Sequence, residues 1–152
     1  MEKLNLPEYR FRVIRRNNQS YIFDPIRKKE LVLTPEEWVR QNFVQYLIHE
    51  KQYPATLTRL EMSFKVNKWV RRSDIVVFNT EGKPVVLVEC KAPSIKIDQK
   101  VFDQIARYNM VLKSEILIVT NGIQHYCCSI DYRAETYHYL DQIPGYFELP
   151  VL

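Results

Sequence analysis

The chain has 152 residues, of which 46% are hydrophobic, and a formal net charge of +4. This length predicts one domain spanning residues 1–152, and the hydrophobic content excludes a disordered chain. The three cysteines do not form a disulfide framework, and the sequence has neither a signal-peptide pattern nor an apolar run that could cross a bilayer, so a cytoplasmic protein without membrane contacts is expected.

The N-terminal third is predicted to contain a β-hairpin and then a helix. Residues 9–33 hold short apolar stretches separated by polar residues, which is typical of a hairpin. The helix is expected to run from Thr34 to about residue 50. Thr34 can cap it, Pro35 suits its first position, and Glu37 completes a capping box.

Three further strands are predicted in the middle of the chain. Residues 57–66 form the first, and residues 68–72 are expected to connect it to an apolar hairpin over residues 73–91. If that hairpin turns near Thr80 and Glu81, residues whose numbers sum to roughly 161–163 oppose each other. Asp74 then lies opposite one of residues 87–89.

The last third is predicted to complete an α/β fold. A helix is expected from Asp98, a plausible cap, to Leu112, followed by a strand without polar alternation over residues 116–120. Residues 124–139 are expected to add strands at the edge of the sheet. The predicted architecture is a mixed central sheet with a helix on each face.

Two carboxylates and an ammonium are expected to meet at one end of the apolar hairpin. Side chains two apart on a strand share a face, so Lys91 lies beside Glu89, and Asp74 faces them from the opposite strand. Mg²⁺ binds one or two carboxylates together with water and phosphate, so this set suits phosphodiester hydrolysis with Mg²⁺, or Mn²⁺ as its substitute. The alternative is an ion pair of Lys91 with either acid, without a catalytic role.

Glycine usage excludes a nucleotide cofactor. The chain has three glycines, and none begins a phosphate-binding loop of the G-x-x-x-x-G-K-[ST] type. By itself the chain is therefore no ATP-driven motor.

An ordered set of motifs resembles the PD-(D/E)XK nucleases, and in particular the N-terminal nuclease domain of type I restriction enzyme R subunits. The matching stretches are residues 34–44, Ser73-Asp74, residues 88–93, residues 104–108 and residues 119–122. They span a core of roughly residues 34–122. No proline precedes Asp74, and the long motor region of the restriction subunits is absent from this sequence.

The resemblance implies a restriction-endonuclease-like fold and further site residues. Asp74 and Glu89 correspond to metal ligands and Lys91 to the catalytic lysine, while Glu37 is either a further ligand or only the helix cap. Gln104 and Tyr108 lie four residues apart, and this spacing matches a motif whose residues line the active site in RecB-like nucleases. The implied function is a metal-dependent nuclease, endonuclease rather than exonuclease.

The partner is expected to be DNA, together with other restriction or helicase subunits. Several basic groups are candidates for phosphate contacts, and Arg71 and Arg72 are placed nearest the DNA because they adjoin Asp74. Two alternatives stay open. One is a catalytically silent module that keeps the fold for DNA binding or subunit assembly. The other is a stability module whose acids and lysine only form ion pairs.

Overall fold

A six-stranded mixed sheet forms the centre of the protein, in the order β4-β5-β6-β7-β8-β9. The computed structural model describes residues 1–149, apart from the side chains of Val66 and Tyr108. Neighbouring strands run antiparallel except β6 and β7, which are parallel. The strands are β4 (Thr58–Val66), β5 (Trp69–Phe78), β6 (Pro84–Cys90), β7 (Ile116–Thr120), β8 (His125–Asp131) and β9 (Thr136–Leu140). The expected mixed α/β sheet is confirmed.

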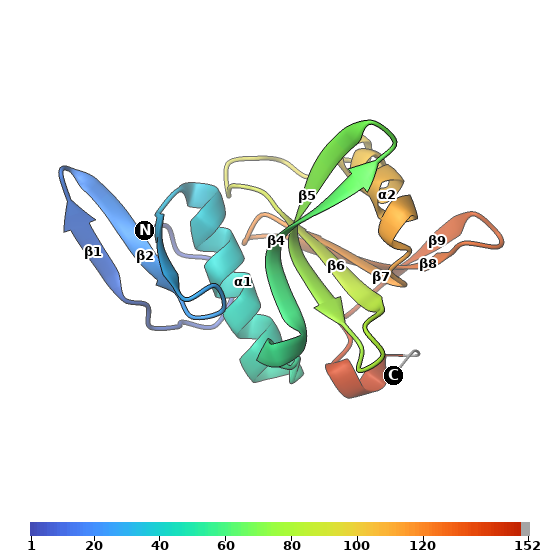
Figure 1. The fold of residues 1–152 in the computed structure, drawn as a ribbon, viewed down its shortest axis with the longest axis horizontal. Coiled ribbons are helices and arrows are strands. Elements are labelled where there is room, and N and C mark those ends of the chain that lie inside the picture. Colours follow the sequence, from blue (N-terminus) through green and yellow to red (C-terminus); the bar gives the residue numbers. More distant parts are fainter. Residues whose placement is uncertain (150–152) are drawn as a thin grey trace.

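Helix α1 (Pro35–Lys51) lies between this sheet and a smaller N-terminal one (Figure 1). The Thr34 hydroxyl accepts the backbone N–H of Glu37 at 3.0 Å, as an N-cap does. The reciprocal half of the predicted capping box is absent, because the Thr34 N–H donates to the Val32 carbonyl and the Glu37 carboxylate binds arginines instead. The cap therefore leaves the Glu37 side chain available to the interior.

The N-terminal region is a three-stranded antiparallel sheet, a correction to the predicted hairpin. After β1 (Val13–Arg16) and β2 (Gln19–Asp24), the chain turns and adds β3 (Lys29–Val32) against β2. The turn is held by the Asp24 carboxylate, which accepts two backbone N–H groups from the residues that follow it. The polar residues of this turn resemble the end of a hairpin in the sequence, and for this reason β3 was not predicted as a separate strand.

Two apolar cores cover the two faces of the large sheet. Side chains from α1, with Phe43 and Leu47 fully buried, pack on one face, and α2 (Gln99–Leu112) packs on the other through Phe102 and Ile105. Strand β7 is buried at every position, because both of its faces are covered. The predicted α2 cap is confirmed, since the Asp98 carboxylate accepts the Val101 N–H at 2.9 Å.

Residues 69–72 belong to strand β5, which corrects their assignment to a connection. They pair with residues 63–66 of β4, so the two strands form a ribbon that extends beyond the neighbouring strands (Figure 1). Two 3₁₀ turns, Ala55–Leu57 and Tyr146–Glu148, complete the regular structure. In the described part of the chain, no helix has the length and apolar character needed to span a membrane.

Candidate active site

Asp74 and Glu89 meet where β5 and β6 leave the core. Ile75 pairs with Val88 and Val76 with Leu87, so the register continues to Asp74 opposite Glu89, within the range predicted from the turn. The two carboxyl groups share a hydrogen bond, and burial, the charge of Asp74 and this bond raise the pKa of Glu89 well above its ordinary value of 4.5. One proton therefore lies between the two acids at neutral pH.

Asp74 is held from two sides. Its Oδ1 accepts from Nη2 of Arg40 on α1 at 2.5 Å, and its Oδ2 accepts the backbone N–H of Cys90 at 2.8 Å. Burial opposes the charge of Arg40, but Asp74 and Glu37 outweigh that effect and raise the pKa of the guanidinium. Asp74 thus forms its ion pair with Arg40. In the alternative considered from the sequence, Lys91 formed an ion pair with either Asp74 or Glu89.

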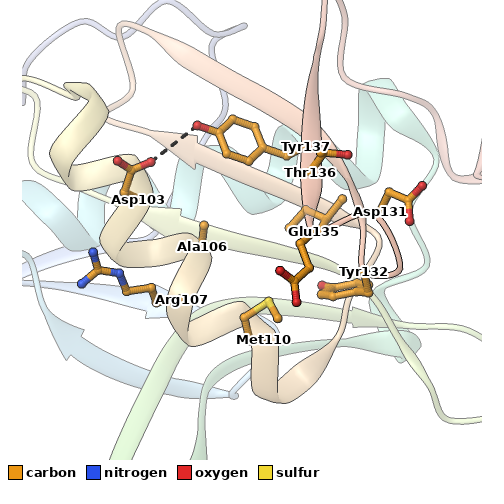
Figure 2. A pocket seen from close by; sticks show the side chains of 10 residues that line it. Asp103, Ala106, Arg107, Met110, Asp131, Tyr132, Glu135, Thr136 and Tyr137 are labelled. Atoms are coloured by element: carbon orange, nitrogen blue, oxygen red, sulfur yellow. Dashed lines mark hydrogen bonds between the residues drawn. The ribbon is translucent and has the colours of Figure 1, made fainter.

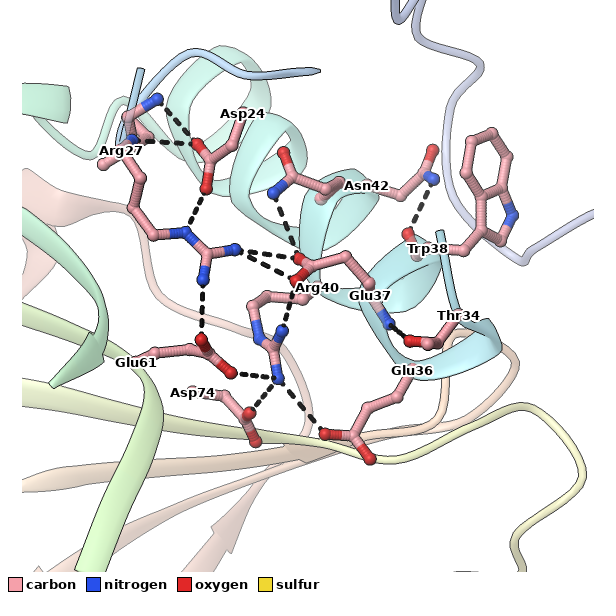
Figure 3. A network of polar contacts seen from close by, with 12 residues as sticks. Asp24, Arg27, Thr34, Glu36, Glu37, Trp38, Arg40, Asn42, Glu61 and Asp74 are labelled. Atoms are coloured by element: carbon pink, nitrogen blue, oxygen red, sulfur yellow. Dashed lines mark hydrogen bonds and ion pairs between the residues drawn. The ribbon is translucent and has the colours of Figure 1, made fainter. Parts of the chain in front are cut away.

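Two arginines, nearly buried, link the N-terminal sheet, α1 and β4 into one network of charges (Figure 3). Arg27 binds Asp24, both oxygens of Glu37, and Glu61 at 2.8 Å. Arg40 bridges to the same two glutamates, with Nη1 at 2.7 Å from Glu37 and Nη2 at 3.4 Å from Glu61. Figure 3 shows the two guanidinium groups one after the other along the network, with that of Arg40 next to Asp74.

Glu61 occupies an unusual backbone position opposite Asp74. It has a left-handed φ of +51°, between the paired residues Leu60 and Met62. Leu60 belongs to the core under α1, whereas Met62 packs against the core under α2. Alternate strand residues normally share a face, so β4 changes faces at Glu61. This strained residue turns its carboxylate toward the arginines, and local strain of this kind is concentrated at functional sites.

Glu36 is an α1 carboxylate on which the charge of Asp74 acts. Burial and the charge of Asp74 raise the pKa of Glu36, while Arg40 and Lys91 lower it. Lys91 also lowers the pKa of Glu89, so its positive charge acts on both glutamates. Glu37 was expected to be either a further ligand or only the helix cap; its backbone N–H donates to the Thr34 hydroxyl, and its carboxylate binds Arg27 and Arg40.

Four further residues had been predicted for the site. Gln104 is exposed on α2. Tyr108 is part of the same helix, but its side chain lies outside the described residues. Arg72 lies near the cluster, with its Nη2 3.6 Å from Oε1 of Glu61, and Arg71 lies next to it on β5. Arg40, Glu36 and Glu61 are the additions that the structure makes.

A separate pocket of about 430 Å³ lies between α2 and the β8–β9 hairpin (Figure 2). Its lining includes Asp103, Arg107 and Met110 from the helix, and Tyr132 and Tyr137 from the hairpin. The Tyr137 hydroxyl lies 3.5 Å from the Asp103 carboxylate across its rim. Neither Asp74 nor Glu89 lines this pocket, so it is distinct from the acid pair between β5 and β6.

A family profile described as "Type I restriction enzyme R protein N terminus (HSDR_N)" matches residues 35–144. The chain belongs to this family. The matched region contains α1, the acid pair, Lys91 and α2, so the site described above falls inside it. No curated protein matches the chain.

The fold of this R-protein N-terminal domain is shared with a solved structure. That structure is a fragment described as the HsdR subunit of a type I restriction enzyme from Vibrio vulnificus YJ016, with a TM-score of 0.55 and 21% identity. The match covers 77% of this chain and 24% of that chain. The present chain thus spans about a quarter of the length of the protein it resembles, and the likeness concerns the fold.

The donor set of the acid pair fits a hard divalent cation. Within residues 1–149, no three acidic, histidine or cysteine side chains are arranged to hold a metal together. Mg²⁺ does not need three, because it keeps several waters and takes one or two carboxylates. Asp74 and Glu89 supply two such carboxylates. A divalent cation bound between them would replace the shared proton in offsetting the repulsion of the two carboxylates.

Metal binding at the acid pair is expected to release a proton. Because the raised pKa keeps Glu89 protonated at neutral pH, a divalent cation has to displace that proton. The affinity for Mn²⁺ should therefore rise with pH through the neutral range. Calorimetry in two buffers of different ionisation enthalpy counts the protons released. An affinity that is independent of pH, with no proton release, contradicts the assignment.

The same pKa shift sets the pH dependence of stability without metal. A group whose pKa is raised on folding contributes stability that is complete below its unfolded value of 4.5 and is lost as pH rises toward the folded value. Glu89→Gln is the control, because the amide has no proton to lose. The unfolding free energy of Glu89→Gln should fall less than that of the wild type between pH 5 and pH 9. This pH range lies above the pKa of about 4.3 of an ordinary glutamate carboxyl group.

Proposed function

We propose that this domain hydrolyses phosphodiester bonds of DNA as a metal-dependent endonuclease within a type I restriction system. The observation that carries the proposal is the pair of carboxyl groups of Asp74 and Glu89, which lie opposite each other on β5 and β6, with Lys91 directly after Cys90 at the end of β6. Membership in the R-protein N-terminal family supports the same reading. The other subunits of such a system and its DNA are the proposed partners.

Asp74 and Glu89 would hold Mg²⁺, or Mn²⁺ in its place. When bound, the cation supplies Lewis-acid activation of water and neutralises charge on the phosphoryl oxygens. Lys91 lies on the Glu89 face of β6, where its ammonium orients water and stabilises the negative charge of the transition state. Glu36 adds a carboxylate at the edge of the site, where it can accept a proton from water.

Lys91 is kept in place by the sheet. Its backbone N–H donates to the Thr120 carbonyl at 2.8 Å, which continues the β6–β7 pairing one residue past Cys90. Since Glu89 and Lys91 are two apart on an extended segment, both side chains leave the sheet on one side. This rigid positioning is what proximity catalysis requires.

A silent module is the second candidate, and the arginine network favours it. Arg40 already neutralises Asp74 and contacts Glu36, so the cluster is partly compensated by the protein itself. In that case the acids would hold α1 to the sheet, and the domain would serve subunit assembly or DNA binding. This candidate predicts no response to divalent cations.

Plasmid nicking separates the two candidates. The wild-type protein should convert supercoiled to nicked plasmid in Mg²⁺ or Mn²⁺ and not in EDTA. The double variant Asp74→Ala/Glu89→Ala should be inactive, and it should lose the weak heat of Mn²⁺ binding in calorimetry. Identical Mn²⁺ titrations for the two proteins would remove the metal assignment.

The matched control changes two acids elsewhere on the surface. Glu81 lies in the exposed β5–β6 turn and Glu135 in the exposed β8–β9 turn, away from the acid pair. Glu81→Ala/Glu135→Ala removes the same number of carboxyl groups as the double variant. It should keep both nicking and Mn²⁺ binding.

A further inference from the structure

The β4–β5 ribbon holds a charge equal to the net charge of the whole chain. From Met62 to Ser73 the sequence contains four basic residues and no acidic one, whereas the formal net charge of all 152 residues is +4. The rest of the chain is therefore neutral overall. The basic residues of the ribbon are Lys65, Lys68, Arg71 and Arg72.

These charges lie on both faces of the ribbon. Lys65 pairs with Val70, and Val70 and Arg72 are two apart on β5, so Lys65 and Arg72 share one face. Arg71 lies on the other face, with its guanidinium carbon 6.0 Å from the centre of the Trp69 ring. A ribbon that lay flat on a polyanion would need charge on one face only.

The end of the ribbon is apolar. Trp69 is 66% exposed and Val70 is 63% exposed, beside the turn that contains Lys68. An aromatic ring and a β-branched side chain at a projecting tip are typical of a surface that contacts a partner.

The N-terminal sheet offers a contrast. Arg12 and Arg16 also stand on a hairpin, but both pair with Glu30, and each guanidinium lies over an aromatic ring of its own sheet. These arginines are already partnered within the protein. In the ribbon, the basic side chains of Lys65, Lys68 and Arg72 are exposed, so they offer positive charge to an outside anion.

We propose that the β4–β5 ribbon enters a groove of duplex DNA, with Trp69 and Val70 against the base edges and the basic side chains against the phosphates on both walls. The major groove of B-form DNA accepts a two-stranded ribbon, whereas the major groove of duplex RNA is too narrow. This inference rests on the proposed function, which makes DNA the substrate. Arg72 connects the two sites, because it also contacts Glu61 of the charge network.

Fluorescence of Trp69 tests the insertion directly. The chain has two tryptophans, and Trp38→Phe leaves Trp69 as the single reporter. The titration uses a 25-base-pair DNA duplex in EDTA, so that no cleavage occurs. Duplex binding should change the emission of Trp69 and protect it from acrylamide quenching. Binding measured by anisotropy without any change at Trp69 would overturn the proposal.

Affinity measurements test the roles of the tip and of the charges. Trp69→Ala/Val70→Ala should weaken duplex DNA binding about tenfold and leave single-stranded DNA and duplex RNA binding nearly unchanged. Arg71→Ala/Arg72→Ala should reduce the slope of log affinity against log salt by about two. Arg12→Ala/Arg16→Ala removes the same charge from the N-terminal sheet, and it should leave the slope unchanged.

The outcomes distinguish this inference from the proposed function. Because Trp69 and Val70 are exposed, Trp69→Ala/Val70→Ala should melt as the wild type does. An equal loss of affinity for single strands and duplexes would show a stacking surface and overturn groove insertion. Equal slopes for the two arginine pairs would also overturn it. In both cases, metal-dependent nicking by the wild type would still support the nuclease, whereas its absence together with normal duplex binding would count against the nuclease alone.

Discussion

Lys91→Ala is expected to abolish metal-dependent nicking while leaving the fold intact. The charge of Lys91 acts on Glu89 and Glu36, and in the proposed mechanism it stabilises charge that develops during hydrolysis, so its loss should fall on turnover and hardly on DNA affinity. Removal of one such donor typically costs on the order of 10²–10³ in rate. Single-turnover nicking, with DNA affinity measured in EDTA, separates the two effects.

Thermal unfolding of the same variant tests the ion-pair alternative. If Lys91 and Glu89 formed only a buried pair, removal of either partner would cost about 3–5 kcal/mol of stability. Glu89→Gln keeps the shape of the side chain and should inactivate by weakening the metal site. Lys83→Ala removes an exposed ammonium from the other end of the same hairpin and should change neither property. A large fall in melting temperature for Lys91→Ala, with no nicking by the wild type in any metal, would rule out the nuclease.

Local patterns were sufficient to predict the elements that bury an apolar face. The cap at Thr34, the buried strand β7 and the opposition of Asp74 and Glu89 all follow from signals within a few residues of each element. A one-residue slip would have sent every side chain of the hairpin to the wrong face, so the apolar pattern strongly restricts its register. That is why the acid pair could be anticipated.

The parts that were missed depend on contacts between distant segments. Residues 69–72 form a strand with little apolar burial, and a ribbon with two exposed faces has no alternation to detect. Glu61 takes a left-handed backbone conformation that nothing in its sequence signals. Arg40 follows Glu36 by four residues, a spacing that indicates a helix pair, but its contact with Asp74 requires α1 to pack on β5.

The choice between Glu36 and Glu37 shows how a local rule can mislead. Glu37 stands three residues after Thr34, so the capping box implied a helix-cap role for it, whereas the family resemblance implied a metal-ligand role. In the structure its carboxylate is committed to Arg27 and Arg40. The adjacent Glu36 points away from Arg27 and lies close enough to Asp74 for that charge to raise its pKa. One residue on a helix is a rotation of about 100°, enough to exchange the two roles.

Arg40→Met is expected to lower the melting temperature and to make the protein respond more strongly to divalent cations. Methionine keeps most of the apolar stem but removes the charge that neutralises Asp74 and Glu37, and a buried charge left without its partner costs about 3–5 kcal/mol. For a chain of this size that corresponds to a fall of roughly 10 °C. Differential scanning calorimetry, with and without Mn²⁺, measures both effects.

The reason for the cation response is competition at one oxygen. Arg40 Nη2 lies 2.5 Å from Oδ1 of Asp74, so a divalent cation that binds this carboxylate has to share it with the guanidinium. Without Arg40, the cation no longer competes with a guanidinium group at Asp74, and it offsets the lost positive charge. Mn²⁺ should therefore raise the melting temperature of Arg40→Met by more than it raises that of the wild type, because a ligand that binds the folded state alone stabilises it.

Arg27→Met is the matched control for this experiment. Arg27 is nearly as buried as Arg40, and it binds Asp24, Glu37 and Glu61, but its ion pairs do not include Asp74. Its loss should destabilise the protein to a similar degree without strengthening the response to Mn²⁺. If both variants respond to Mn²⁺ as the wild type does, and NaCl of equal ionic strength has the same effect, then the cluster binds no divalent cation. In that event the two arginines are sufficient to neutralise the acids, and the network holds α1 to the sheet without catalysing a reaction.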